Sequence, residues 1–436
     1  MKPSIEPRLL KGFRDFLPNT EIVRKSIIRK LETVFEQFGF VPIDTPAIEY
    51  ADILLGKSGG ETEKQIYTFQ DQGDRQVALR FDLTVPFARF LAQHRAELTI
   101  PFKRYHIAKA WRGEKPQDGR YREFMQCDFD IVGVDSASAD LEILLLMYRS
   151  FKTLGLEKFS IHFSHRGVFN DFLGSLNVDK NSEEVLRIVD KSKKIGPDQT
   201  REELKRLLPQ AAASRVMEFI SPGGSLESTI EKLVQMLGED NRHVARLKSL
   251  YDGLETLGIA SFFTLDTSIT RGLDYYTALV FETFVQGAEH LGSVCSGGRY
   301  DNLVALYSPE QLSGIGASIG LDRLLTVLDT IGELPPGRGP VRVVIPVIEE
   351  ELTGYYHKLA EMLRSEHIAV EVFLSRTKLA SQFTQAEKKG IAYAVLVGGR
   401  EREQNVVHIR DFSLRKNHEN LSLPEAIVKL KELLGR

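Results

Sequence analysis

The sequence has only two cysteines and no long apolar run. Cys127 and Cys295 are far apart in a chain of 436 residues, which excludes a disulfide framework and a cysteine-rich zinc site. No apolar stretch approaches the roughly 20 residues that a membrane-spanning helix needs, so no membrane association is expected. Residues 1–8 lack the apolar segment of a secretory signal, and a cytoplasmic setting is therefore expected.

An excess of one charge, an internal repeat and a low-complexity tract are also absent. Because the formal net charge is −3, any nucleic acid would have to be bound through local patches of charge. A composition of 42% apolar and 27% charged residues is typical of a globular protein. The length is more than a single core usually serves, and it predicts roughly two to four domains.

Apolar spacing divides the chain into segments of different character. Steps of three and four residues predict a helix over 20–38. Alternation predicts mostly strands over 67–131. Charged, helix-spaced segments around 180–256 predict a helical insertion, after which strands return over 263–328 and a helix begins near Leu321.

Residues 333–340 form the clearest linker, with three prolines and two glycines in eight residues. Beyond it strand and helix patterns alternate, which predicts a small α/β domain with a largely parallel sheet. The predicted division gives 1–175 and 259–332 to a larger domain in two parts, 176–258 to the insertion, 333–340 to the linker and 341–436 to the C-terminal domain.

Two strings concentrate the side chains of a binding pocket. They are Arg271-Gly-Leu-Asp-Tyr-Tyr276 and Ser296-Gly-Gly-Arg-Tyr-Asp301. Arginine supplies a planar fork of donors for a carboxylate or phosphate, and tyrosine supplies a hydroxyl on a rigid aromatic body. Together they suit a pocket that holds an anionic centre and orients a flat polar ring.

These strings resemble the two signature strings of histidyl-tRNA synthetases, a family of class II aminoacyl-tRNA synthetases. Other strings resemble family motifs in the same order, at 11–18, 79–89, 111–126 and 314–323. The resemblance implies an α+β fold, in which a class II catalytic domain with an antiparallel sheet carries a helical insertion and a C-terminal α/β anticodon-binding domain. The helix over 20–38 and the extended segment ending at Pro46 fit motif 1, which implies a homodimer.

The resemblance assigns three arginines to the reaction. Arg112, in motif 2, would grip the α-phosphate of ATP, and Arg323, in motif 3, would contact the γ-phosphate. Arg271 would touch the histidine carboxylate and the α-phosphate, so that Arg112 and Arg271 are the catalytic residues and both adjoin the histidine. Mg²⁺ would enter with ATP between its β- and γ-phosphates, and no protein metal ligand is identified. The alternative for Arg271 is a structural salt bridge to Asp274 or Asp301.

The residues assigned to the α-ammonium group of histidine are Asp82, Thr84 and Gln126. Asp82 and Thr84 alternate to one face of a predicted strand, so both can meet one ligand. Many bacterial members carry Glu where Asp82 and Asp130 stand, whereas the strings of this chain resemble the eukaryotic and archaeal branch. The consequence of the shorter side chains for the geometry stays open.

The imidazole would be bonded from two sides, by Asp130 and by the hydroxyl of Tyr276, with Tyr275 packing or bonding nearby. Such a site rejects substrates without ring nitrogens, because its own buried polar groups would stay unpaired. The alternative for Asp130 is a strand-end carboxylate paired to a nearby cation, and one of the tyrosines can serve core packing alone.

The C-terminal domain resembles the anticodon-binding domain of histidyl, prolyl, threonyl and glycyl enzymes. From residue 341 onward 15 lysines and arginines stand against 13 acidic residues, so no strong basic face is established. Arg400, Arg402 and Arg410 are the candidates for anticodon contacts, with solvated surface charge as the alternative.

Together these features predict ATP-dependent ligation of L-histidine to histidine tRNA through a histidyl-adenylate. The alternative is a non-catalytic, synthetase-like regulatory subunit of histidine biosynthesis, which lacks the anticodon domain and has degraded signature strings. A prolyl or threonyl enzyme is disfavoured because it would not carry Arg271-Gly-Leu-Asp-Tyr-Tyr276. A tRNA-sensing kinase domain is disfavoured because the sequence has no kinase signature.

Overall fold

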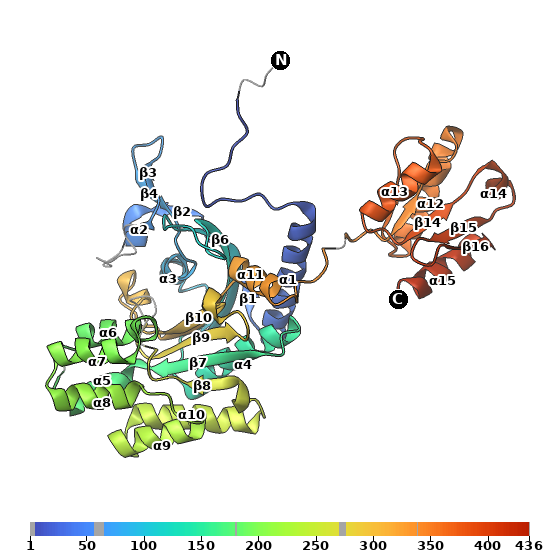
Figure 1. Cartoon of the computed structure of the whole chain (residues 1–436). Helices are drawn as coiled ribbons and strands as arrows, with labels where there is room; N and C mark the ends of the chain where they lie inside the picture. Colours follow the sequence, from blue (N-terminus) through green and yellow to red (C-terminus); the bar gives the residue numbers. More distant parts are fainter. Residues whose placement is uncertain (1–4, 56–64, 179–180, 270–275, 338, 436) are drawn as a thin grey trace. The chain divides into compact units, whose positions relative to one another are not determined.

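The computed structural model describes residues 5–55, 65–178, 181–269, 276–337 and 339–435 (Figure 1). Arg271 and Tyr275 therefore lie outside the described residues. The chain divides into two compact units, one of Met1–Asp15 with Arg24–Leu334 and one of Phe16–Val23 with Pro335–Arg436. No helix within the described ranges is long and apolar enough to cross a membrane.

Helix α1 (Pro18–Gln37) confirms the helix predicted over 20–38. Ile27, Leu31 and Phe35 recur every four residues on its buried face, and each is less than 4% exposed. The helix is followed by Gly39, whose φ of 77° favours a residue without a side chain.

The larger unit is built on an eight-stranded sheet, called here the large sheet. Only its outer pairs β1–β5 and β7–β8 are parallel, so the predicted antiparallel character is confirmed. In spatial order the strands are β1 (Val41–Pro42), β5 (Phe102–Trp111), β6 (Glu123–Val132), β11 (Gly314–Gly320), β10 (Cys295–Tyr300), β9 (Leu279–Val285), β7 (Phe159–His165) and β8 (Phe263–Leu265).

Several helices pack on the large sheet, and Phe35 of α1 lies against the rings of Tyr105 in β5 and Phe129 in β6. Helix α4 (Ala137–Thr153) and helix α11 (Leu321–Thr330) both contact β6 and β11. The start of α11 confirms the helix predicted near Leu321. Short 3-10 helices complete the unit at η3 (Ala260–Phe262), η4 (Glu289–Leu291) and η5 (Val304–Leu306).

A smaller three-stranded sheet lies before β5, and it corrects the strand predicted through Asp82 and Thr84. Its strands are β2 (Ile48–Tyr50), β4 (Gln76–Leu79) and β3 (Thr68–Gln70), with α2 (Ala51–Leu55) beside it. Strand β4 ends at Leu79, and Thr84 begins helix α3 (Thr84–Gln93). The Asp82 carboxylate accepts a hydrogen bond of 3.1 Å from the Val85 amide, which satisfies a free donor of the first helical turn. A helix start, not a strand, brings the two side chains together.

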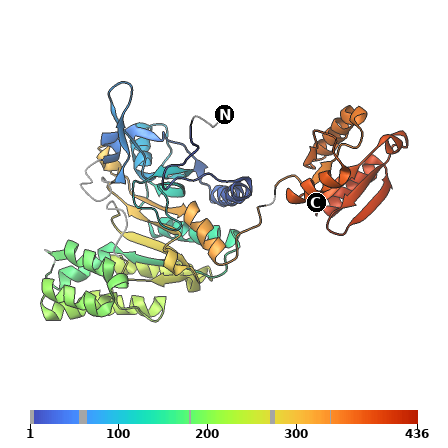
Figure 2. The ribbon, with the colours of Figure 1, turned by 45° about the horizontal axis from the view of Figure 1, so that its top comes forward.

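Six helices run between β7 and β8 and form the helical insertion. Figures 1 and 2 both show them gathered beside the β7–β8 edge of the large sheet. Apolar residues such as Phe172, Leu204 and Leu233 are fully buried among them, so the insertion has its own core. The helices are α5 (Arg166–Ser175), α6 (Ser182–Ile195), α7 (Pro197–Leu207), α8 (Gln210–Ile220), α9 (Leu226–Leu237) and α10 (Arg242–Thr256).

The smaller unit carries a five-stranded sheet with a core of its own. Its order is β13 (Val370–Val372), β12 (Val343–Ile345), β14 (Tyr393–Leu396), β15 (Val407–Asp411) and β16 (Lys416–Leu421). The helices are η6 (Glu350–Leu352), α12 (Thr353–Ser365), α13 (Leu379–Lys388), α14 (Gly399–Glu403) and α15 (Leu423–Leu433).

The prediction of a largely parallel sheet in this unit is only half right. The pairs β13–β12 and β12–β14 are parallel, but β14–β15 and β15–β16 are antiparallel. A parallel crossover needs a dozen or more residues, and the connections around α14 and before β16 are shorter than that. Short connections therefore turn the last two strands back.

Candidate active site

A cavity of about 360 Å³ lies over the large sheet and brings together most of the predicted site residues. Its walls come from the start of α3, the β5–β6 hairpin, strands β9, β10 and β11, and the start of α11. Six predicted residues line it: Asp82, Thr84, Arg112, Gln126, Tyr276 and Arg323. The sequence analysis did not single out Glu114, Arg120, Tyr121, Glu282, Ser318 or Asp322, which also line it. Glu114, Arg120 and Tyr121 lie within the quoted motif 2 string, which was the available signal.

Acceptor groups line part of the cavity. Asp82 is fully buried yet reaches the cavity wall beside Thr84. The amide nitrogen of Gln126 donates to the Ser318 hydroxyl at 2.7 Å, which fixes the orientation of the side chain. The amide oxygen of Gln126 is buried and finds no hydrogen-bond partner among the described residues. A carboxylate, a hydroxyl and an unused carbonyl together suit an ammonium group.

Arginines also line the cavity. Arg112 donates through Nε to the Phe81 carbonyl at 3.0 Å and lies over the Phe124 ring at 5.0 Å. No acidic partner of Arg112 is found within the described part of the chain. Its terminal nitrogens are therefore available for an anion.

Arg323 adds a second positive charge to the cavity wall. Its Nη1 donates to the Ser293 carbonyl at 2.8 Å. Burial lowers the pKa of the Arg323 guanidinium, the cations Arg120 and Arg112 lower it further, and Glu114 opposes them. A bound polyanion would relieve this crowding of like charge. No cluster of three or more metal-ligating side chains occurs in the described ranges.

The ring of Tyr276 packs closely against strand β10 because that strand has glycine at position 298. A Cβ on Gly298 would lie 2.9 Å from Cδ1 of Tyr276. The residue after the tyrosine ties the backbone down, since the Thr277 amide donates to the Arg299 carbonyl at 2.8 Å. Tyr276 and Thr277 are therefore packed against the second signature string.

Asp130, which was predicted to accept a hydrogen bond from the substrate imidazole, already has two partners within the protein. It is 2% exposed, does not line the cavity, and accepts a hydrogen bond of 2.6 Å from the Tyr300 hydroxyl. Its other oxygen lies 2.7 Å from the fully buried Arg104, an ion pair without hydrogen-bond alignment. A Cβ on Gly316 would lie 2.0 Å from the carboxylate, so only glycine leaves room for it. The cation partner expected in the alternative interpretation is thus present.

The neighbouring carboxyl group of Asp128 has an altered acidity. Burial raises its pKa to about 7, although Arg104 acts in the opposite direction. Burial also raises the pKa of the thiols of Cys127 and Cys295. Neither cysteine is therefore a nucleophile at neutral pH.

The N-terminal string at 11–18, which was quoted only for its resemblance, contacts the β5–β6 hairpin loop. The Arg122 amide donates to the Gly12 carbonyl at 2.9 Å. Arg14 lies over the Tyr121 ring at 3.4 Å and pairs with Asp322 at 2.5 Å. Two residues of the cavity wall are thus held by the N-terminal segment.

The three arginines proposed to contact RNA are in the smaller unit. Arg400 and Arg402 belong to the short helix α14, and Arg402 lies over the Tyr355 ring at 5.3 Å. Arg410, in β15, donates to the Arg415 carbonyl at 2.8 Å and to Asn417 at 2.9 Å. The Arg410 side chain is thereby hydrogen-bonded within the β15–β16 hairpin.

Comparison with known proteins matches both units. A family model described as Histidyl-tRNA synthetase matches residues 12–324, and one described as Anticodon binding domain matches residues 342–433. A curated relative from Treponema denticola, named Histidine–tRNA ligase, is 49% identical over 403 residues, which cover 91% of this chain and 90% of the relative.

Solved structures agree. The histidyl-tRNA synthetase of Nostoc sp. PCC 7120 is similar with a TM-score of 0.90 and 31% identity, over 98% of this chain and all of that one. A protein of Bacillus halodurans, described as an ATP phosphoribosyltransferase regulatory subunit/histidyl-tRNA synthetase, has a TM-score of 0.75 and 25% identity, over 88% of this chain and 97% of that one.

Proposed function

Because the chain belongs to the histidyl-tRNA synthetase family, we propose that its cavity holds histidine and ATP side by side. The protein is a histidine–tRNA ligase that uses ATP as a substrate. One observation carries the site assignment: one cavity is lined both by acceptor groups and by Arg112 and Arg323, for which no acidic side-chain partner is found among the described residues. An amino acid joined to a nucleotide has this distribution of charge.

Asp82, Thr84 and the free carbonyl of Gln126 bind the α-ammonium group of histidine. Tyr276 bonds one nitrogen of the imidazole. Asp130, which is held in place by Tyr300 and Arg104, accepts a hydrogen bond from the other nitrogen. A ligand without ring nitrogens would make neither of these two hydrogen bonds and would bind more weakly.

Arg112 and Arg271 act where the carboxylate meets the α-phosphate. A histidine carboxylate oxygen attacks the α-phosphorus, the bond to the β-phosphate oxygen breaks, and pyrophosphate leaves. A hydroxyl of the terminal adenosine of the tRNA then attacks the carbonyl carbon and releases AMP. Fixed cations at the crowded phosphorus stabilise the transition state. Arg323 contacts the γ-phosphate, and Mg²⁺ enters bound to the phosphate oxygens of ATP, its preferred ligands.

The smaller unit binds the anticodon of histidine tRNA, and Arg400 and Arg402 on α14 are the contacts we favour over Arg410. The chain works in the cytoplasm as a homodimer. Support for the dimer comes from two edge strands, β1 and β2, where Val41, Ile48 and Tyr50 are 47%, 47% and 53% exposed. Exposed apolar edges favour pairing with a second chain, and light scattering should give twice the chain mass.

The regulatory-subunit alternative is not favoured. The match to an anticodon-binding domain over residues 342–433, and the long match to a relative named as a ligase, both point to the enzyme.

Histidine-dependent exchange between pyrophosphate and ATP tests the site directly. Wild type should exchange with histidine alone among the amino acids. Arg112→Ala and Arg271→Ala should each lower the exchange rate by about 10²–10³-fold, the usual effect of losing one preorganised donor. Arg75→Ala, an exposed arginine paired with Asp71, is the control and should leave the rate unchanged. Full activity of the Arg112 and Arg271 variants would refute the assignment.

A further inference from the structure

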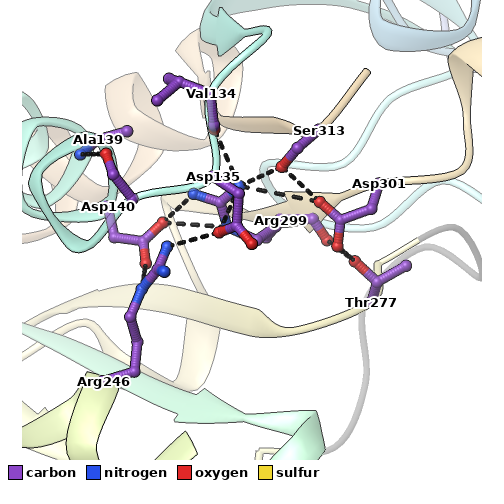
Figure 3. Close-up of polar contacts among 10 residues, drawn as sticks. Val134, Asp135, Ala139, Asp140, Arg246, Thr277, Arg299, Asp301 and Ser313 are labelled. Atoms are coloured by element: carbon purple, nitrogen blue, oxygen red, sulfur yellow. Dashed lines mark hydrogen bonds and ion pairs between the residues drawn. The ribbon is translucent and has the colours of Figure 1, made fainter. Parts of the chain in front are cut away.

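A buried polar network lies outside the cavity and includes Arg299 of the second signature string. Figure 3 shows its members pointing toward one another from five separate segments of the chain. Its centre is Asp140 of α4, 1% exposed, and Arg299 of β10, 3% exposed. We call it the Asp140 network; it comprises Asp135, Asp140, Arg246, Thr277, Arg299, Asp301 and Ser313.

At one end the network holds the residue after Tyr276. The Thr277 hydroxyl donates to Asp301 at 2.5 Å, and the Ser313 hydroxyl donates to the other oxygen of Asp301 at 2.6 Å. Arg299 donates to Ser313 and lies 3.8 Å from Asp301. The position of Asp301, and through it the backbone beside Tyr276, therefore depends on Arg299.

At the other end the network reaches the helical insertion. Arg246 of α10 donates through Nε to Asp140 at 2.7 Å and through Nη2 to Asp135 at 2.9 Å. Arg299 donates through Nε to the other oxygen of Asp140 at 3.1 Å. A single buried carboxylate thus joins a guanidinium of the insertion to a guanidinium of the second signature string.

The shared carboxylate makes the two ends interdependent. Asp140 is too buried to replace a lost arginine with water, so removing Arg246 leaves it paired to Arg299 alone. The carboxylate must then turn toward Arg299, which has other bonds to Ser313 and to the Val134 carbonyl. A buried ion network of this kind has few arrangements that satisfy every member.

We propose that Arg246, Asp140, Arg299 and Asp301 are positioning residues. They link the helical insertion to the backbone that holds Tyr276 in place. The inference rests on the proposed function, in which Tyr276 bonds the histidine ring. A displacement of α10 is passed through Asp140 and Arg299 to Thr277, and it changes how well the pocket fits histidine. None of the four residues touches a substrate.

The test measures KM for histidine and for ATP in pyrophosphate exchange, with the whole chain. Thr277→Val keeps the shape but removes the hydroxyl, and should raise KM for histidine about 5–10-fold, while Thr277→Ser restores it. Arg246→Gln should raise the same KM about 3–10-fold. Neither should change KM for ATP by more than about 2-fold, since the proposed function gives Tyr276 no contact with the nucleotide. Lys248→Gln, an exposed charge loss on the same helix, should change neither.

The double variant Arg246→Gln with Thr277→Val decides whether the ends are connected. Connected ends give a double variant within about 2-fold of the worse single variant, whereas independent ends multiply their effects. Multiplying effects, or equal losses for histidine and ATP that follow the unfolding midpoint, would overturn the inference. Tyr276→Phe separates the proposed function from the positioning role of the Asp140 network. If Tyr276→Phe leaves KM for histidine unchanged, the proposed function is refuted. If it raises KM for histidine while Thr277→Val and Arg246→Gln do not, only the positioning role is refuted.

Discussion

Large polar side chains pack closely against the large sheet where a neighbouring strand carries glycine. Asp130 lies over Gly316 and Tyr276 over Gly298. A side chain on either glycine would lift the polar group off the sheet by the width of a methyl group or more. The glycines of the second signature string and of motif 3 therefore leave room for specific side chains of the protein, as well as for a nucleotide.

The hydroxyl of Tyr300 gives a test of how Asp130 acts. Tyr300→Phe removes the 2.6 Å hydrogen bond to Asp130 without touching the cavity wall. If Asp130 reads the imidazole, its carboxylate will lose orientation and KM for histidine should rise about 10-fold, with KM for ATP unchanged. Tyr393→Phe, which removes a hydroxyl bonded to the Leu433 carbonyl in the smaller unit, is the matched control. An unaltered KM for histidine in Tyr300→Phe would remove Asp130 from the site.

Asp128 predicts a pH dependence of stability. Its pKa is about 7 in the folded chain against 3.8 as its ordinary value. Between these values the folded state holds a proton that the unfolded state has lost, so this group's contribution to the free energy of unfolding falls as pH rises from about 4 to about 7. Asp128→Asn removes the penalty, and it should be more stable than wild type by about 1–4 kcal/mol at pH 8 and by much less at pH 4.5.

Urea unfolding at the two pH values measures this difference. The exposed Asp252→Asn is the control, and its difference from wild type should not change with pH. A gain in Asp128→Asn that is equal at both pH values would mean that ionisation of Asp128 is not its source.

At the scale of the elements, the start of α3 shows that cavity-lining residues can be predicted where the secondary structure around them is not. Asp82 and Thr84 were placed on one strand face, and they instead begin a helix with Pro86 in its first turn. Alternation over three residues cannot distinguish a strand from a helix start. A carboxylate two residues before a hydroxyl occurs in both structures. Asp82 and Thr84 nevertheless both line the cavity, because two residues this close in sequence can reach one space in either conformation.

The contact of the N-terminal segment with the hairpin loop can be tested at Gly12. Its φ is 87°, and an added Cβ would lie 2.8 Å from Cγ of Arg122. Gly39 has a similar φ of 77° with nothing within 4 Å of its Cβ. Both alanine variants carry the backbone strain of about 1 kcal/mol, but only Gly12→Ala also displaces Arg122. We expect Gly12→Ala to lose more stability in urea unfolding and to raise KM for ATP. Equal effects of the two variants would mean that the contact with the loop contributes nothing.

At the scale of the molecule, the order of motifs along the sequence was enough to predict the fold class and the ligase family. The buried partners were not predictable. Arg104 beneath Asp130, and Asp140 between two arginines, come from segments that carry no family string and meet only through strand pairing and helix packing. Single-sequence patterns indicate which face is buried, but they do not indicate which charges meet there.

Each unit has a hydrophobic core of its own, and this predicts two unfolding transitions for the whole chain. Leu146 of α4 is fully buried in the larger unit, and Leu359 of α12 is 2% exposed in the core of the smaller. A Leu→Ala change at such a site costs about 2–5 kcal/mol. In calorimetry Leu359→Ala should lower one transition by at least about 8 °C and leave the other in place, whereas Leu146→Ala should lower the other alone. Histidine with ATP should raise only the transition that Leu146→Ala lowers, since ligands stabilise the unit that binds them. A single transition shifted by both variants would mean that the two cores unfold as one.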